Sequence, residues 1–560
     1  MSLPISPETL ERLDPNTLRL LLAYLNLPPV GALADGAGHP DLGSDAGYEL
    51  AAPLRAVLGE RRARAGQFSD ARDLLGINGF DEAELTALVR RLGDGRRYGH
   101  RMRSVWGGPE GEREFFALLE TATRYIHIET FIVGGEIGLR LVNLLARKLH
   151  EGVKVRLLFC ASGFVISGTP SGTGFVSSLS ELRSFLVNDM YVRRRLVHFM
   201  RENGVPFLNA SPIGRHFKRT DLRRQGVRGP RGYQQWQRAR GVPDAWLAEQ
   251  EIIDRQCGLA FSNVDHRKMV IVDGERAFIG SQNIADSYFY SNQLDPDPRV
   301  NVRRWQWHDN STIIEGGCIA EMNRLFAQRW ILSGGDLFEP SDSFYMRPPR
   351  QLGDGVVTLE ASIPGMLRMA WPANLPRLLM SLLGADRRPL TEGSNPIRNR
   401  IMRLPELARE EMVAEHCYPC DGELLEHWAT VAPRLPRFTM IVPRHYDTLT
   451  LGVECDRFFP ALSKAGINLQ TYRPAILHSK LALVDKFYIA TGSYNLTLRS
   501  GRADLEAQFF IQSAEYGREL HQRLADDLTL CEPARPNALA RLRSRRSIPL
   551  IDATIRYLLF

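Results

Sequence analysis

Two stretches of the chain repeat one combination of histidine, lysine, aspartate, serine and asparagine. They are VDHRKMVIVDGERAFIGSQN at 264–283 and ILHSKLALVDKFYIATGSYN at 476–495. A lone His-x-Lys is more often an exposed pair than a site, but its recurrence at identical spacing favours a shared chemical role. The matched residues are His266, Lys268, Asp273, Gly280, Ser281 and Asn283 in the first stretch, and His478, Lys480, Asp485, Gly492, Ser493 and Asn495 in the second.

The chemistry that suits this pattern is displacement at a phosphodiester. Side chains at i and i+2 of a strand point to one face, so each histidine stands beside its lysine. Lysine and asparagine hold phosphate oxygens and stabilise developing charge. We therefore predict that the catalytic residues are His266, Lys268, His478 and Lys480. The predicted phosphate-binding residues are Ser281, Asn283, Ser493 and Asn495.

Two such units that face each other place one imidazole on each side of a phosphorus atom. A neutral histidine attacks phosphorus while a protonated one donates to the leaving oxygen, and the latter then deprotonates the incoming water or alcohol. Each ring needs an acceptor on its far nitrogen to keep its tautomer. Asp309 in WHDN and Glu506 in DLEAQ follow the repeats at suitable positions. Neither a metal nor a cofactor is required, because the lysines supply the positive charge.

The elements around the repeats predict an α/β fold. From about residue 101, the segments EREFFALLETA, RYIHIETFIV, GLRLVNLLARKLHEG and VKVRLLFCA read as helix, strand, helix and strand. This order implies parallel strands with helices on their faces. The second half repeats the order less regularly, with MIVPRHYD, CDRFFPALSKAG and INLQTY ahead of the second repeat. We predict a duplication, with two α/β lobes related by a pseudo-twofold axis at 101–345 and 346–535.

The two ends of the chain are predicted to lie outside these lobes. Residues 1–100 form an extra N-terminal helical region, in which FSDARDLLGINGFDEAELTALVRRLGDG weakly resembles a helix-hairpin-helix element. The turn lacks the second glycine of that element, so a plain helical hairpin is favoured. Residues 536–560 form a basic and apolar tail. This tail and the proline-broken segment 361–384 either pack into the protein or dip into a membrane interface.

Composition bounds the class of protein. Hydrophobic residues make up 44% and charged residues 24% of the chain, which is typical of soluble globular proteins. No run of about 18 uncharged apolar residues predicts a transmembrane helix, and the N-terminus lacks the features of a signal peptide. The cysteines are odd in number and scattered, which indicates reduced thiols. Cys417 and Cys420 form a CxxC without a second ligand pair, so packed thiols are favoured over a metal or redox site.

Positive charge is concentrated in one segment. Between Gly214 and Arg240 there are nine Lys or Arg and a single acid, whereas the whole chain carries a formal charge of only +7. Phe217, Tyr233 and Trp236 lie among these arginines. The segment 214–240 suits a polyanion, either nucleic acid or an anionic membrane surface, and a solvated insertion is the alternative.

The chain resembles the phospholipase D superfamily, whose mark is the HKD motif in two copies. The resemblance runs from about 105 to 530 and is strongest with bacterial cardiolipin synthase-like proteins. It rests on YIHIETFIV, DHRKMVIVDGERAFIGSQNIADSYF, WHDNSTIIEG, LHSKLALVD and GSYNLTLRS. It implies a two-lobed fold with the site between the lobes, a covalent phosphohistidine and no metal. By analogy His266 is the nucleophile and His478 the acid and base, while Asp273 and Asp485 are more structural than Asp309 and Glu506.

The function predicted from these features is phosphatidyl transfer or hydrolysis on glycerophospholipids. The alternatives are a nuclease of the same family, which the basic segment favours, and a non-catalytic scaffold, which the complete motifs oppose. Residues 214–258 and 384–430 match no recognised pattern, and the choice of substrate is expected to depend on them. The expected partner is a phospholipid at a membrane surface, with no obligatory protein partner. The expected location is cytoplasmic, peripheral at the inner face of the membrane.

Overall fold

The structure is a computed structural model, and most of the chain between 96 and 535 is described. The described ranges are 96–160, 190–210, 220–256, 264–289, 307–338, 352–369, 391–446 and 449–535. The predictions for residues 1–95 of the N-terminal helical region, for the tail 536–560 and for most of the proline-broken segment lie outside these residues. Residues 96–100 of the predicted helical region are instead the start of a strand, β1 (Arg96–Trp106). No helix of the described ranges has the combined length and apolar character needed to span a bilayer.

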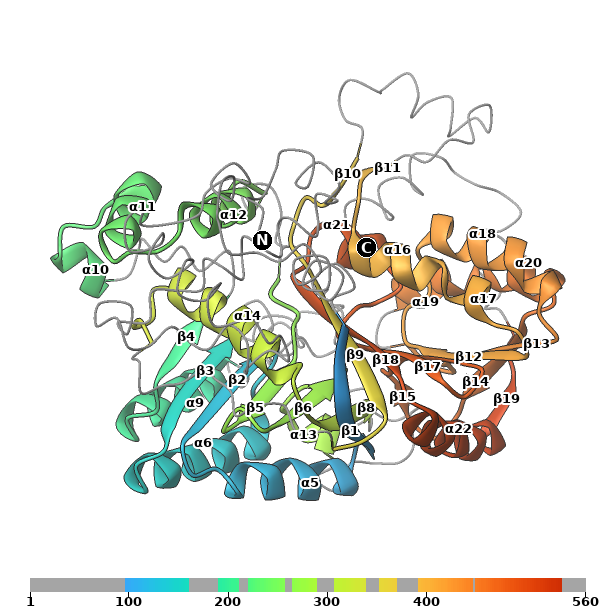
Figure 1. The fold of residues 1–560 in the computed structure, drawn as a ribbon, viewed down its shortest axis with the longest axis horizontal. Coiled ribbons are helices and arrows are strands. Elements are labelled where there is room, and N and C mark those ends of the chain that lie inside the picture. The colour runs from blue at the N-terminus through green and yellow to red at the C-terminus, as the bar shows by residue number, and fades with distance from the viewer. Residues whose placement is uncertain are drawn as a thin grey trace, which may run out of the picture.

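One sheet of 15 strands runs through both halves of the molecule (Figure 1). Its first-half strands are β1 (Arg96–Trp106), β2 (Tyr125–Thr130), β3 (Lys154–Phe159), β4 (Phe207–Asn209), β5 (Met269–Val272), β6 (Arg276–Gly280) and β8 (Asn310–Glu315). Its second-half strands are β9 (Gly355–Ser362), β12 (Glu411–His416), β13 (Arg437–Pro443), β14 (Asn468–Tyr472), β16 (Lys480–Val484), β17 (Tyr488–Gly492), β18 (Glu506–Gln512) and β19 (Cys531–Pro533).

The strand order has twofold symmetry about the antiparallel pair β1–β9. Outward from that pair the first half runs β1-β8-β6-β5-β2-β3-β4, and the second runs β9-β18-β17-β16-β12-β13-β14. β2, β3 and β4 are parallel to one another, as are β12, β13 and β14, whereas the strands nearer the centre are antiparallel. The predicted α/β fold with two lobes related by a pseudo-twofold axis is confirmed.

Helices cover both faces of the sheet. The first lobe contains α5 (Pro109–Glu120), α6 (Gly135–His150), α9 (Met190–Glu202), α10 (Thr220–Arg224), α11 (Gly229–Ala239), α12 (Asp244–Gln256), α13 (Asp286–Phe289) and α14 (Ile319–Leu332). The second contains α16 (Pro396–Met402), α17 (Leu404–Leu407), α18 (Gly422–Val431), η7 (Ala432–Arg434), α19 (Leu449–Asp456), α20 (Phe459–Lys464), α21 (Leu498–Arg502) and α22 (Ala514–Thr529). In Figure 1, α14 lies above the sheet on the left and α22 below it on the right, as a twofold axis along the line of sight requires.

The core is continuous between the lobes. One apolar cluster contains Phe326 and Trp330 of α14 together with Leu520 of α22 and Phe509 of β18. The outer helices of each lobe pack on the opposite face of the sheet in clusters of their own. Burial of apolar surface across the lobe boundary therefore holds the two motif-bearing halves in a fixed arrangement.

The strand β12 of the second lobe was not predicted from the sequence. β12 lies in the segment 384–430, which matched no recognised pattern, and its six residues are all buried. It occupies the place that β2 has in the first lobe, so MIVP in β13 corresponds to β3 and not to β2. A strand buried on both faces shows no alternation of polar and apolar residues, and the Glu-Met-Val-Ala-Glu-His of β12 has charged residues at both ends.

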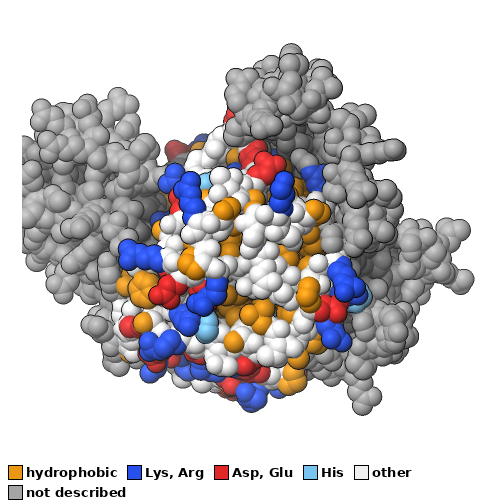
Figure 2. Space-filling view, turned by 90° about the vertical axis from the view of Figure 1, so that its right-hand side faces the viewer, with side chains coloured by type: hydrophobic (Ala, Val, Ile, Leu, Met, Phe, Trp, Pro, Cys, Tyr) orange, Lys and Arg blue, Asp and Glu red, His pale blue; other side chains and the backbone are white. Residues whose placement is uncertain are grey.

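The outer face of the second lobe carries mixed charge. Figure 2 shows Lys and Arg side chains interspersed with Asp and Glu, and hydrophobic side chains in small groups between them. The large hydrophobic side chains exposed in the described part of this lobe are Leu407, Phe487 and Leu530, from separate segments. Single exposed apolar residues of this kind are ordinary for a protein surface.

Candidate active site

Each motif is carried by a β-hairpin at the centre of the molecule. The first hairpin is β5–β6 and the second is β16–β17. Each motif histidine precedes the first strand of its hairpin and pairs with the other half of the chain. The backbone N–H of His266 donates to Leu505 at 2.9 Å, and that of His478 donates to His308 at 2.8 Å. The latter contact belongs to a short parallel pair, β7 (Trp307–His308) with β15 (Ile476–Leu477).

The acceptor of each histidine comes from the opposite lobe. Nδ1 of His478 lies 2.8 Å from Oδ1 of Asp309. Nδ1 of His266 lies 3.1 Å from Oε1 of Glu506 and 3.1 Å from the carbonyl oxygen of Ser493. Because Nδ1 of each ring is engaged with an acceptor, Nε2 is the nitrogen left for chemistry. The two acids chosen from the sequence therefore contact the rings, in a crossed arrangement that the sequence did not specify.

The two motif serines bind these acids. Oγ of Ser281 donates to Oδ1 of Asp309 at 2.6 Å, and Oγ of Ser493 donates to Oε2 of Glu506 at 2.5 Å. Both serines are almost fully buried. In this arrangement each serine fixes the carboxylate that orients a histidine. Phosphate binding by the serine hydroxyls stays a prediction, and their geometry favours a positioning role instead.

The two lysines lie beside the histidines in the same way in both lobes. Nζ of Lys268 donates to the carbonyl oxygen of His266 at 2.7 Å, and Nζ of Lys480 donates to that of His478 at 2.9 Å. Nζ of Lys480 also lies 3.2 Å from Nε2 of His478. The i and i+2 placement expected from the sequence therefore brings each ammonium to its histidine, and that of Lys480 to the ring itself. Both lysines are buried, which strengthens their effect on a bound anion.

Burial and like charge set the protonation of this group. Burial, followed by the charges of Lys268 and Lys480, holds the pKa of His266 well below its usual value. Burial also lowers the pKa of His478 to about 3, although Asp309 opposes this shift. Burial and then Lys480 lower the pKa of Lys268 to about 7. A bound phosphodiester anion would favour the protonated forms of these groups and reverse these shifts.

The two acids differ in their electrostatic state. Burial raises the pKa of Glu506 to about 7. Burial also acts to raise the pKa of Asp309, but the charge and hydrogen bond of His478, with Lys480 and Ser281, hold it below its usual value. Asp309 is therefore ionised at neutral pH, whereas Glu506 is partly protonated. The two half-sites are similar in geometry and unlike in charge.

The motif aspartates lie at the far ends of the hairpins. Asp273 and Asp485 have positive φ values of 55° and 49°. The Asp273 carboxylate accepts from the backbone N–H groups of residues 123–125, and that of Asp485 from residues 409–411. Neither contacts a motif histidine, so both are structural in this fold. They tie each hairpin to the start of β2 or β12.

The motif glycines are required by a close backbone approach. Gly280 has a φ of 143°, and a Cβ there would lie 2.4 Å from the carbonyl oxygen of Asn310. Gly492 is equivalent, with the carbonyl oxygen of Ala507 at 2.5 Å from such a Cβ. These contacts bring β6 against β8 and β17 against β18. Each acid is thereby set beside the serine that follows the glycine.

The two motif asparagines are placed for an anion in different ways. Oδ1 of Asn283 is buried without a hydrogen-bond partner. Asn283 and Lys268 line one small pocket together with Thr130. Oδ1 of Asn495 accepts from Sγ of Cys417 at 3.2 Å, which leaves the donating amide nitrogen as the group to bind an anion.

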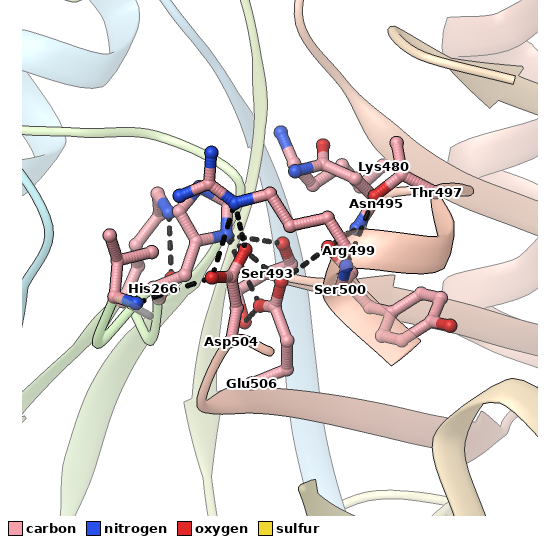
Figure 3. A network of polar contacts seen from close by, with 12 residues as sticks. His266, Lys480, Ser493, Asn495, Thr497, Arg499, Ser500, Asp504 and Glu506 are labelled. Atoms are coloured by element: carbon pink, nitrogen blue, oxygen red, sulfur yellow. Dashed lines mark hydrogen bonds and ion pairs between the residues drawn. The ribbon is translucent and has the colours of Figure 1, made fainter. Parts of the chain in front are cut away.

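Arg499 is a site residue to which the sequence assigned no role. It lies in α21, directly after the second motif, and its Nε donates to Oδ2 of Asp504 at 3.1 Å. Figure 3 shows its guanidinium reaching across to His266, and its charge contributes to the lowered pKa of that histidine. About a quarter of its side chain is exposed. The sequence signal was an arginine close behind Gly-Ser-x-Asn in GSYNLTLRS.

The comparisons with known proteins agree with this geometry. The family model described as "Cardiolipin synthase, PLD-like domain" matches residues 417–528. A cardiolipin synthase of Geobacillus kaustophilus is 23% identical over 424 residues, which are 75% of this chain and 64% of that protein. Cardiolipin synthase 1 of Bacillus anthracis is 22% identical over 473 residues, covering 83% of this chain and 74% of that protein. These matches support the resemblance to the phospholipase D superfamily that the two motifs indicate.

A solved structure supports the same fold. The phosphatidylserine synthase of Haemophilus influenzae Rd KW20 matches with a TM-score of 0.50 at 12% identity, over 82% of this chain and 95% of that one. At this identity the match concerns the fold alone. The match to the Geobacillus relative spans just under two thirds of that protein's length.

The basic segment forms helices at the margin of the first lobe. Its described part contains α10 and α11, which lie at the upper left in Figure 1. Tyr233 and Gln237 anchor α11, since they donate to the carbonyl oxygens of Leu332 and Ile331 at the end of α14. The arginines exposed on these helices and on the turn between them are Arg223, Arg224, Arg228, Arg231 and Arg238. The predicted charged insertion is therefore a folded unit with an arginine-rich surface.

The CxxC pair differs from a second cluster of side chains in its capacity to bind a metal ion. Cys417 and Cys420 are buried and form no disulfide, and within the described ranges they belong to no group of three ligands. The single group of three that the described ranges contain is His308, Glu415 and Asp527. The sequence did not predict this second group, whose members lie far apart along the chain.

Proposed function

We propose that this chain transfers or hydrolyses phosphatidyl groups of glycerophospholipids through a covalent phosphohistidine. The observation that carries the proposal is the pair of buried histidines, each with a lysine beside it and an acid from the opposite lobe on its Nδ1. The relatives named cardiolipin synthase, which align with three quarters or more of this chain, support a phospholipid substrate. The whole activity, the substrate and the partners are part of this proposal.

In the first step, His266 attacks the phosphorus atom through Nε2. A P–N bond forms as the P–O bond to the leaving alcohol breaks, and Nε2–H of His478 gives its proton to the leaving oxygen. Lys268, Lys480 and the motif asparagines stabilise the charge that develops on the phosphoryl oxygens. The ionised Asp309 supports the positive charge that His478 carries before it donates.

In the second step, His478 takes a proton from the acceptor. A hydroxyl group of a lipid alcohol or a water molecule then attacks phosphorus, a P–O bond forms and the P–N bond to His266 breaks. The acceptor therefore decides between transfer and hydrolysis. Nucleophilic attack suits His266 because its acceptor Glu506 is partly protonated, and so supports a charged ring less than the ionised Asp309 supports that of His478.

We also propose that the protein works at an anionic membrane surface, peripheral to the inner face. The exposed arginines of α10 and α11 would bind acidic headgroups and bring the protein to its substrate. Each basic residue near such a surface contributes on the order of 1 kcal/mol. Nucleic acid is the other polyanion that this surface fits, and a direct test separates the two.

The test is incubation of the purified full chain with phosphatidylglycerol vesicles and, separately, with labelled DNA and RNA, without added metal. Cardiolipin with free glycerol is the expected product pair for transfer, and phosphatidic acid with glycerol is the pair for hydrolysis. Cleaved nucleic acid with unchanged lipid would overturn the phospholipid proposal in favour of a nuclease. No product from any substrate, in protein shown to be folded, would favour the scaffold.

Two variants test the mechanism. His266→Ala and His478→Ala should each lower turnover by at least about 1,000-fold, since both rings act in both steps. Acid-labile phosphoenzyme should not accumulate in His266→Ala, which lacks the nucleophile, nor in protein that has not been given substrate. Turnover near the wild-type rate in either variant would remove the two-histidine mechanism.

A further inference from the structure

The second lobe buries a polar cluster behind the histidine motif. Nε2 of His308 lies 3.0 Å from Oδ2 of Asp527 and 3.8 Å from Oε1 of Glu415. All three side chains are less than a tenth exposed, and one ligand atom from each lies within 4.8 Å of the others. They come from β7, α22 and β12, so the fold gathers them from three distant segments. The mechanism above uses none of them.

Glu415 lacks the partners that a buried carboxylate needs. It is fully buried, and neither of its oxygens accepts a hydrogen bond of ordinary geometry. The Ser479 hydroxyl lies near it, and the ring of His308 is the nearest group that can carry positive charge. Burial and then the charge of Asp527 raise the pKa of Glu415 to about 8, so either a proton or an opposite charge is expected to neutralise this carboxylate.

Glu129, at the equivalent position in the first lobe, also accepts no hydrogen bond, but it has a guanidinium beside it. Glu129 pairs with Met269 across β2–β5 as Glu415 pairs with Leu481 across β12–β16, so the two glutamates are structural counterparts. Nη1 of Arg267 lies 3.6 Å from Oε1 of Glu129. The counterpart of Arg267 in the second motif is Ser479, which carries no charge.

The balance of charge in the first lobe is completed by a second pair. Nε of Arg329 donates to Oδ2 of Asp265 at 2.9 Å, next to Glu129. Two buried acids thus face two buried arginines in the first lobe. In the second lobe two buried acids, Glu415 and Asp527, face one imidazole. The second lobe is short of positive charge at the position where the first has a guanidinium.

We propose that His308, Glu415 and Asp527 bind a divalent transition-metal ion, for which Zn²⁺ is the best match. One imidazole nitrogen and two carboxylate oxygens are ligands that Zn²⁺ prefers, whereas Mg²⁺ and Ca²⁺ prefer oxygen alone. Bonds of about 2.0–2.1 Å in a tetrahedral site set the ligand atoms about 3.3 Å apart. The observed separations from Nε2 of His308, 3.0 and 3.8 Å, bracket that value.

The surroundings of His308 fit metal binding. The hydroxyl oxygen of Tyr472 lies 3.2 Å from Nδ1 of His308, and the two rings stack with centroids 4.4 Å apart. A metal-binding histidine donates its other ring N–H to such an acceptor, which fixes its tautomer. A charge of +2 would cancel the two carboxylates, just as the arginines do in the first lobe.

The role of this ion would be structural. It would join β7 of the first half to β12 and α22 of the second, and His308 directly precedes Asp309. The carbonyl oxygen of His308 also accepts from the backbone N–H of His478. A fixed His308 therefore holds the Asp309–His478 pair in register. The inference does not depend on the identity of the substrate.

The first test is metal content. The full chain is expressed with added Zn²⁺, desalted in a weak chelator and analysed by mass spectrometry for bound metal. We expect about one equivalent in the wild type and less than about a tenth in Glu415→Gln, Asp527→Asn and His308→Gln. The control variants Glu129→Gln and Cys420→Ser should keep the wild-type content. A wild type without metal, or full metal in Glu415→Gln, would overturn the proposal.

The second test is the sign of a stability change. With Zn²⁺ bound, Glu415→Gln removes a ligand and should lower Tm by at least about 3 °C, and strong chelation of the wild type should lower it similarly. If a proton and not a metal neutralises the cluster, Glu415→Gln instead relieves an unpaired buried charge and leaves Tm equal or higher. That outcome would also overturn the proposal, and circular dichroism at low temperature confirms that each variant is folded.

Discussion

The substitution Asp309→Asn tests whether the two half-sites are unequal. Asp309 is fully buried, and its Oδ1 accepts from Nδ1 of His478 at 2.8 Å and from Oγ of Ser281 at 2.6 Å. Within the described ranges, Nδ1 of His478 has no second acceptor as close as Asp309. The change keeps the shape of the side chain and removes its charge. It therefore isolates the electrostatic support of the ring that donates the proton.

The expected loss follows from the kind of hydrogen bond removed. A buried hydrogen bond to a charged group contributes about 1.5–3 kcal/mol. At about 1.4 kcal/mol per tenfold change, kcat should fall by about 10- to 150-fold. The matched change in the other half-site, Glu506→Gln, should cost less. Nδ1 of His266 keeps the carbonyl oxygen of Ser493 at 3.1 Å, and Glu506 is already partly protonated, so about fivefold is expected.

The assay is kcat at saturating phosphatidylglycerol in vesicles, with product measured by lipid chromatography. Asp354→Asn is the control, because Asp354 accepts from Ser513 and the backbone N–H of Ala514 at the start of α22, remote from the motifs. It should lower Tm and leave kcat unchanged. If Glu506→Gln costs as much as Asp309→Asn or more, the reasoning about unequal half-sites is refuted.

Three further changes probe the scaffold and the protonation of the site. Asp485→Asn removes part of the carboxylate that accepts three backbone N–H groups and should lower the free energy of unfolding by about 1–2 kcal/mol with kcat unchanged, measured by urea titration. Gly280→Ala should lower the free energy of unfolding by more than about 3 kcal/mol, since its Cβ meets a backbone carbonyl oxygen. A soluble variant with the Tm of the wild type would contradict this. The low pKa of His266 keeps that ring neutral as pH falls to 6.5, so the acid limb of kcat/KM should lie below 6.5. Lys268→Met removes a like charge and should move the limb upward; a downward shift would contradict the assignment.

The sequence predicted the chemistry of the site better than it predicted which acid contacts which histidine. His266 and His478 could be chosen because a repeated spacing needs no knowledge of tertiary contacts. Asp309 and Glu506 could be chosen from their order behind each motif. That each acid serves the histidine of the opposite lobe depends on strand order around β1–β9, which no local pattern encodes.

Other features escaped because their signals are tertiary. The contacts of the motif serines with the acids were not predicted, because the backbone approach at Gly280 and Gly492 that places them there is tertiary. The cluster of His308, Glu415 and Asp527 has no spacing that relates its members. β12 was missed since a doubly buried strand lacks alternation.

The pseudo-twofold axis explains why this chain needs both lobes and why they differ. A separated lobe would expose a histidine without its acceptor and an acid without its histidine, since Asp309 serves His478 and Glu506 serves His266. A perfectly symmetric pair would also give both histidines the same pKa, and then neither would be preferred as nucleophile or acid. The two roles require a neutral ring and a proton donor at one moment. The exchange of a carboxylate with a low pKa for one with a raised pKa breaks the symmetry at the rings. The replacement of Arg267 in the first motif by Ser479 in the second also breaks the symmetry behind the rings, beside His308.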